Sequence, residues 1–77
     1  MTFTSTMAQA WVNFRLKLVS TAQTESDLDI LYSAGLADLN RLIEFSLIDA
    51  DEYVVSLTAL QTEVKDQRIF LRAVANS

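Results

Sequence analysis

The sequence predicts an all-α fold: a single domain, residues 1–77, of three helices, in which the second and third form an antiparallel helical hairpin. Two observations lead to this prediction. The chain has no proline and one glycine, so the turn residues that all-β proteins need at each hairpin are missing. Apolar side chains also recur at helical spacing through three segments, about residues 6–19, 25–45 and 50–74.

The first segment carries two apolar stripes. One consists of Met7, Trp11, Phe14 and Leu18, and the other of Val12, Leu16 and Val19. Thr6 and Gln9 have the spacing of a capping box, which favours a helix start there. The run FRLKL alternates apolar and charged residues, so an intermolecular strand over residues 11–19 is the alternative. We favour the helix because the sequence offers such a strand no partner within the chain.

The second segment follows the polar stretch STAQTESD, with Thr24 as the predicted N-cap. Glu25 and Asp27 then lie in the first turn, where negative charge is favourable at the positive end of the helix dipole. The apolar stripe is formed by Leu28, Leu31, Gly35, Leu39 and Leu42. Glycine inside a helix costs about 1 kcal/mol relative to alanine, so we expect a backbone or the Trp11 ring to approach Gly35 closely, or a kink.

The third segment begins with a strong start signal. Asp49 and Glu52 are spaced as a capping box, and Ile48 and Tyr53 are spaced as the hydrophobic staple that accompanies it. We therefore interpret these four residues as the joint between two helices rather than as a calcium loop, whose ligand spacing they lack. A heptad then follows, broken once by a glutamine: Tyr53, Leu57, Leu60, Val64, Gln67, Leu71 and Val74.

Composition argues against catalysis and against bound cofactors. The chain contains neither cysteine nor histidine, so activated thiols, imidazole bases and thiolate or imidazole metal sites are excluded. Asp27 and Asp29 are two residues apart on a helix, so their carboxylates point to different faces. We expect no enzyme activity, no cofactor and no metal.

Charge argues against direct nucleic-acid binding. The formal net charge is −4, and residues 25–52 carry eight acidic side chains and one arginine. Lys65, Arg68 and Arg72 share a helix face, which we interpret as a solvated face balanced by Glu63 and Asp66 rather than as a phosphate-binding strip. No segment reaches the ~20 apolar residues that a membrane span needs. The absence of cysteine fits a reducing compartment, and we expect a cytoplasmic protein with no membrane contact.

The first helix is apolar on more sides than a small bundle covers, which is typical of a helix with an additional partner. The predicted partner-binding residues are Trp11, Val12, Phe14, Arg15, Leu18 and Val19. The alternative is that Met7, Trp11 and Phe14 fill the groove between the other helices and the valines are exposed. We predict a non-enzymatic protein-binding module that regulates or inhibits a host or partner protein, as phage and mobile-element proteins do, and that forms homodimers. Alternatives are a transcription or nucleoid modulator acting on DNA within a complex, and an assembly subunit of a larger particle.

Overall fold

The computed structural model describes residues 5–76, with side chains from residue 9 onward, and contains three helices there. They are α1 (Ser5–Ser20), α2 (Glu25–Glu44) and α3 (Ala50–Ala75). The all-α prediction is confirmed, and each helix begins and ends within one residue of the predicted bounds. Residues 11–19 are helical, so the strand alternative is wrong. The side chains of Thr6 and Met7 lie outside the described side chains, so the Thr6–Gln9 capping box stays a prediction.

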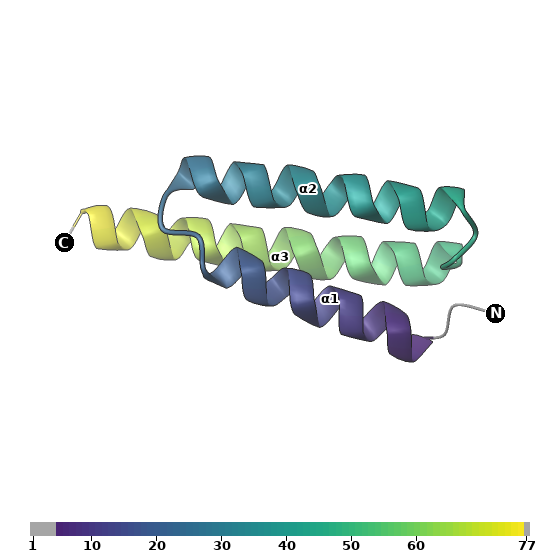
Figure 1. Cartoon of the computed structure of the whole chain (residues 1–77). Helices are drawn as coiled ribbons and strands as arrows, with labels where there is room; N and C mark the ends of the chain where they lie inside the picture. The colour runs from purple at the N-terminus through teal and green to yellow at the C-terminus, as the bar shows by residue number, and fades with distance from the viewer. Residues whose placement is uncertain (1–4, 77) are drawn as a thin grey trace.

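Helix α3 lies between the other two helices (Figure 1). Helices α2 and α3 run antiparallel, as the hairpin prediction requires, and α1 runs parallel to α3 along its other side. Both α1 and α2 pack mainly against α3 and contact each other less. The result is an elongated molecule, with extents of 49 × 18 × 16 Å.

The starts of α2 and α3 follow the predicted cap chemistry. The Thr24 hydroxyl accepts a hydrogen bond from the Asp27 backbone N–H at 3.0 Å. Asp49 Oδ1 accepts from the Glu52 N–H at 2.7 Å, and Glu52 Oε1 accepts from the Asp49 N–H at 3.2 Å. The Thr24 N-cap and the Asp49–Glu52 capping box satisfy backbone donors that the first helical turn leaves without intrahelical partners. The capping box at the helix joint is therefore confirmed.

The joint also ends α2 in a specific way. Ser46 has a positive φ of 58°, its N–H donates to the Ile43 carbonyl, and the Leu47 N–H donates to the Leu42 carbonyl at 2.8 Å. These are the two hydrogen bonds of a Schellman motif. Ile48 is buried just after the turn, and Tyr53 packs against the core cluster to which Ile48 belongs. The chain thereby reverses direction within five residues.

One core cluster joins all three helices. It consists of Val19, Ala22, Leu28, Leu39, Ile48, Leu60 and Val64. Gln67 interrupts the heptad because its Nε2 donates to the Ala22 carbonyl at 2.9 Å, which satisfies a buried backbone acceptor of the α1–α2 connection. The neighbour expected at Gly35 is corrected: a Cβ there would lie 2.8 Å from Leu60 Cδ2, so a leucine side chain fills the space.

Candidate partner-binding surface

The six predicted partner-binding residues of α1 separate into a buried group and an outer group. Val12 is 7% exposed and Val19 is 1% exposed, and Val19 belongs to the core cluster with Leu60 and Val64. Val19 is therefore corrected from a partner contact to an interior residue, whereas Val12 is buried but lines the groove between α1 and α3. The alternative is wrong for the valines, which are buried, and for Phe14, which is mostly exposed, but Trp11 does pack against the core cluster as that alternative predicted.

The outer group consists of Trp11, Phe14 and Leu18, which follow one another at helical spacing. Phe14 is 57% exposed, whereas Trp11 and Leu18 are half-buried. Trp11 packs against the core cluster with part of its surface. Because a solvent-exposed phenylalanine beside a half-exposed tryptophan forms a continuous apolar area, this face has the composition of an interface anchor.

Arg15 holds this outer face in place. Its guanidinium forms an ion pair with Asp38 of α2 and lies 6.0 Å from the centre of the Trp11 ring and 5.8 Å from that of Phe14. Trp11 Nε1 also donates to Asp38 Oδ2, at 3.4 Å. Cation–π contacts at this distance favour a fixed ring orientation. The ion pair and the two ring contacts together restrain the side chains of Trp11 and Phe14.

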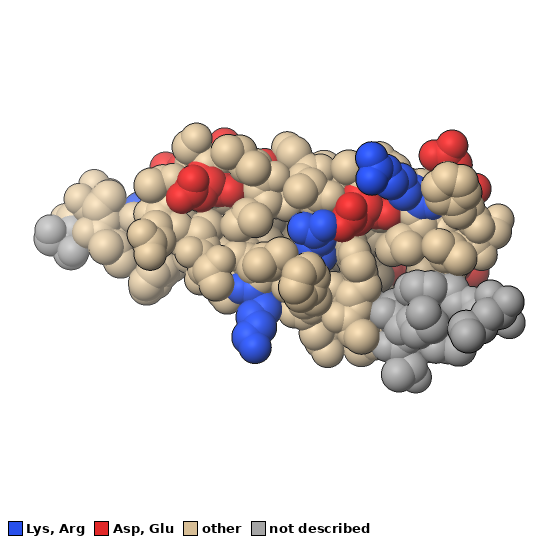
Figure 2. Space-filling view, in the orientation of Figure 1, with Lys and Arg blue, Asp and Glu red and all other residues tan. Residues whose placement is uncertain are grey.

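Uncharged side chains dominate the face of the molecule shown in Figure 2, where charged side chains are scattered between wide uncharged areas. In the described part of the chain, no helix is long and apolar enough to cross a membrane.

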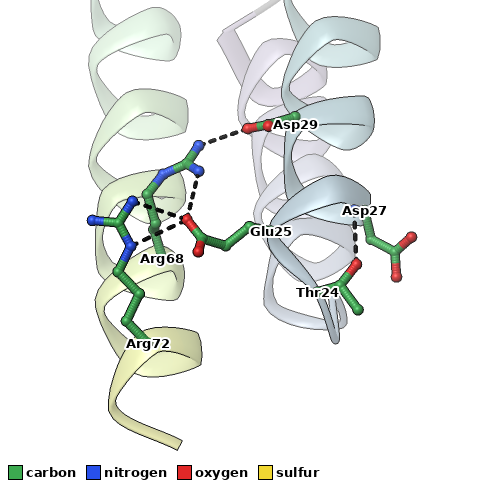
Figure 3. Close-up of polar contacts among 6 residues, drawn as sticks. All are labelled: Thr24, Glu25, Asp27, Asp29, Arg68 and Arg72. Carbon is green, nitrogen blue, oxygen red and sulfur yellow. Dashed lines mark hydrogen bonds and ion pairs between the residues drawn. The ribbon is translucent and has the colours of Figure 1, made fainter. Parts of the chain in front are cut away.

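Two of the three bases on the face formed by Lys65, Arg68 and Arg72 are paired with acids within the molecule (Figure 3). Arg68 pairs with Glu25 at 3.0 Å and with Asp29 at 2.7 Å, and Arg72 pairs with Glu25 at 3.1 Å. The expected balance by Glu63 and Asp66 is thus corrected to a balance by the first turns of α2. Hydrogen bonds from Arg72 and Arg68 lower the pKa of Glu25, and those to Asp29 and Glu25 raise the pKa of Arg68.

The four helix-joint residues lie together as predicted, and their contacts are structural. Asp49 and Glu52 cap α3, Ile48 is buried, and the Tyr53 hydroxyl donates to Asn40 Oδ1 of α2 at 3.2 Å. Among residues 9–76, acidic side chains nowhere gather into a group that could hold a metal ion.

Sequence reasoning missed Asp38, the residue that positions Arg15. No local pattern connects two residues that are 23 positions apart. It also passed over Val54 and Val55, although two adjacent valines on a helix cannot both face the core. That local signal was sufficient to predict an exposed valine.

No family model, curated protein or solved structure matches this chain.

Proposed function

We propose that this protein is a non-enzymatic protein-binding module that uses the outer face of α1 to contact its partner. The supporting observation is the exposure of Phe14 next to Trp11, with both rings in contact with the Arg15–Asp38 pair. Burial of one such aromatic side chain contributes about 1.5–3 kcal/mol. Aromatic residues of this kind supply most of the energy at interface hot spots.

The biological role that fits this chemistry is regulation or inhibition of a host or partner protein, as small phage and mobile-element proteins carry out. Because the chain has no histidine or cysteine, the proposed activity consists of occupying a surface rather than converting a substrate. The cysteine-free composition suits the cytoplasm. These assignments rest on size, composition and the α1 face together.

Pull-down with the tagged full chain tests the proposal. Phe14→Ala should lower the affinity for the captured partner about tenfold or more, because truncation removes an exposed aromatic anchor. The circular dichroism spectrum should remain helical, since the Phe14 side chain is mostly in solvent. Ile30→Ala is the matched control, because Ile30 is an equally exposed apolar side chain on α2.

Retention of the partner by Phe14→Ala, or equal loss with Ile30→Ala, would contradict the α1 face as the binding site. Salt-sensitive retention of the partner complex on DNA would favour the alternative of a modulator acting within a DNA-bound complex. Direct retention of the protein alone is not expected, because Arg68 and Arg72 are paired with acids of α2.

We further propose that two copies associate through the C-terminal turns of α3. Ile69 and Phe70 are exposed there. They lie level with the start of α2, since Arg68 and Arg72 pair with Glu25, and the last turn of α3 extends beyond α2 (Figure 1). A core of this size contributes about 3–5 kcal/mol of net stability, and the chain has no disulfide to add to it. Association would bury the exposed side chains and stabilise both copies.

A further inference from the structure

We propose that the groove between α1 and α3 binds a basic amphipathic helix of a partner protein. This groove, of about 340 Å³, is separate from the outer face of α1: it is lined from α1 by Gln9, Val12 and Leu16, and from α3 by Asp51, Glu52, Val55, Ser56 and Ala59. Trp11, Phe14 and Leu18 do not line it. The inference can therefore fail while the proposed function holds, and the reverse is also true.

Much of the groove lining is apolar. Val12 and Leu16 of α1 line it together with Val55 and Ala59 of α3, and Val55 has 66% of its surface exposed. The lining residues of α3 span positions 51–59, which corresponds to about two helical turns. A partner helix that places apolar side chains three or four residues apart would present them to this length of groove.

The charge of the groove selects the partner. Its lining includes two carboxylates, Asp51 and Glu52, and no lysine or arginine. The bases of α3 lie on its other side: Lys65, Arg68 and Arg72 line a groove with Tyr32 of α2. Helical spacing extends the acidic side along α3, because Glu63 and Asp66 lie 11 and 14 residues after Glu52, close to three and four full turns. Lysine or arginine side chains flanking an apolar stripe would complement this edge.

Of the two carboxylates in the groove lining, Asp51 is exposed and Glu52 is engaged in the cap of α3. Its Oε1 accepts a hydrogen bond from the Asp49 N–H, so the capping box fixes the direction of the carboxylate. Its Oε2 is buried and has no hydrogen-bond partner among the described residues. Because Oε2 is enclosed by this chain, an ammonium or guanidinium group of a partner helix would pair with the exposed carboxylate of Asp51.

The test uses the full chain and a fluorescently labelled synthetic peptide about five helical turns long. Leucines along one face of the peptide and lysines beside them present the proposed chemistry, and a control peptide carries glutamate at the lysine positions. Fluorescence anisotropy should show that the lysine peptide binds, that salt weakens the binding, and that the glutamate peptide does not bind. Asp51→Asn should weaken binding severalfold because it removes one carboxylate from the groove lining.

Two adjacent valines give the matched pair of variants. Val55→Gln should weaken peptide binding about tenfold, because it places a polar side chain in the groove lining. Val54→Gln should leave it unchanged, since Val54 is similarly exposed at 58% but does not line the groove. Phe14→Ala should also leave it unchanged.

Three results would overturn the inference. The first is absence of binding up to about 1 mM peptide, and the second is equal weakening by Val54→Gln and Val55→Gln. The third is loss of self-association by Val55→Gln in light scattering, which would assign the groove to a second copy of this chain.

Discussion

At the residue scale, the described chain adopts a left-handed backbone conformation at Ser46, whereas the one glycine of the sequence, Gly35, lies elsewhere. Ser46 adopts φ 58° in the turn after α2, a conformation that costs an L-residue with a Cβ about 1–2 kcal/mol. Gly35 lies inside α2 with ordinary helical φ, where a Cβ would meet the buried Leu60 side chain. The Schellman hydrogen bonds hold the backbone of Ser46 in the left-handed conformation.

Ser46→Gly should therefore stabilise the protein by about 0.5–1 kcal/mol. Relief of the left-handed strain exceeds the additional backbone entropy that glycine loses on folding, which is about 0.5–1 kcal/mol. Urea denaturation followed by circular dichroism measures the difference. Ser33→Gly, at an exposed position within α2, should change stability with the opposite sign, by about 0.5 kcal/mol. If both variants are destabilised, strain at Ser46 does not limit stability.

At Gly35, the sequence predicted a close approach but not the residue that makes it. A glycine within an apolar helical stripe indicates close approach, and close approach is what the structure has. The neighbour could not be named because it depends on how α2 and α3 are aligned along their axes. That alignment places Leu60 opposite Gly35, and it is set by packing along the whole hairpin rather than by residues near position 35.

At the scale of the helices, the sequence predicted where α2 and α3 begin but not how α1 is rotated about its own axis. Caps such as Thr24 and the Asp49–Glu52 pair act within four residues, so the sequence located the helix starts. The rotation of α1 about its axis was not predictable in the same way, because both of its stripes are apolar. The structure resolves this by pairing Arg15 with Asp38 of α2, which turns Val12 and Val19 inward.

The pairing of α2 with α3 predicts a pH dependence of stability. Arg72 and Arg68 hold the pKa of Glu25 below its ordinary value of 4.5. A group whose pKa is lower in the folded state stabilises that state above the unfolded value, and the stabilisation is lost as pH falls through the folded pKa. Glu25→Gln should therefore lower the urea midpoint at pH 7, and the difference from the parent protein should shrink progressively below about pH 4.5.

Asp27→Asn is the matched control for this experiment. Asp27 lies in the same first turn as Glu25 and shares its helix-dipole environment, but no arginine of the described chain forms an ion pair with it. At pH 7 this variant should differ from the parent less than Glu25→Gln does. An equal effect of the two substitutions would attribute the stabilisation to the helix dipole instead of to Arg68 and Arg72.

At the scale of the whole molecule, the helices differ in length and leave part of α3 uncovered. Helix α3 has 26 residues, α2 has 20 and α1 has 16, so α3 is longer than α2 by about 9 Å. Gln67 binds the connection that follows α1, so the turns beyond it lie past the end of α1. Phe70 is 57% exposed in these turns. An exposed aromatic side chain on a stretch of α3 that α1 does not reach favours contact with another copy.

Self-association should accordingly depend on Phe70. Light scattering after size exclusion should give a mass between monomer and dimer that rises with protein concentration, since association is governed by mass action. Phe70→Ser should return the protein to a monomer while the helical spectrum is retained. Phe45→Ser is the matched control, because Phe45 is 68% exposed but lies at the α2–α3 joint, where the α3 contact would not reach. A monomeric mass at every concentration would contradict association, and an equal effect of both serine variants would move the contact away from the C-terminal turns of α3.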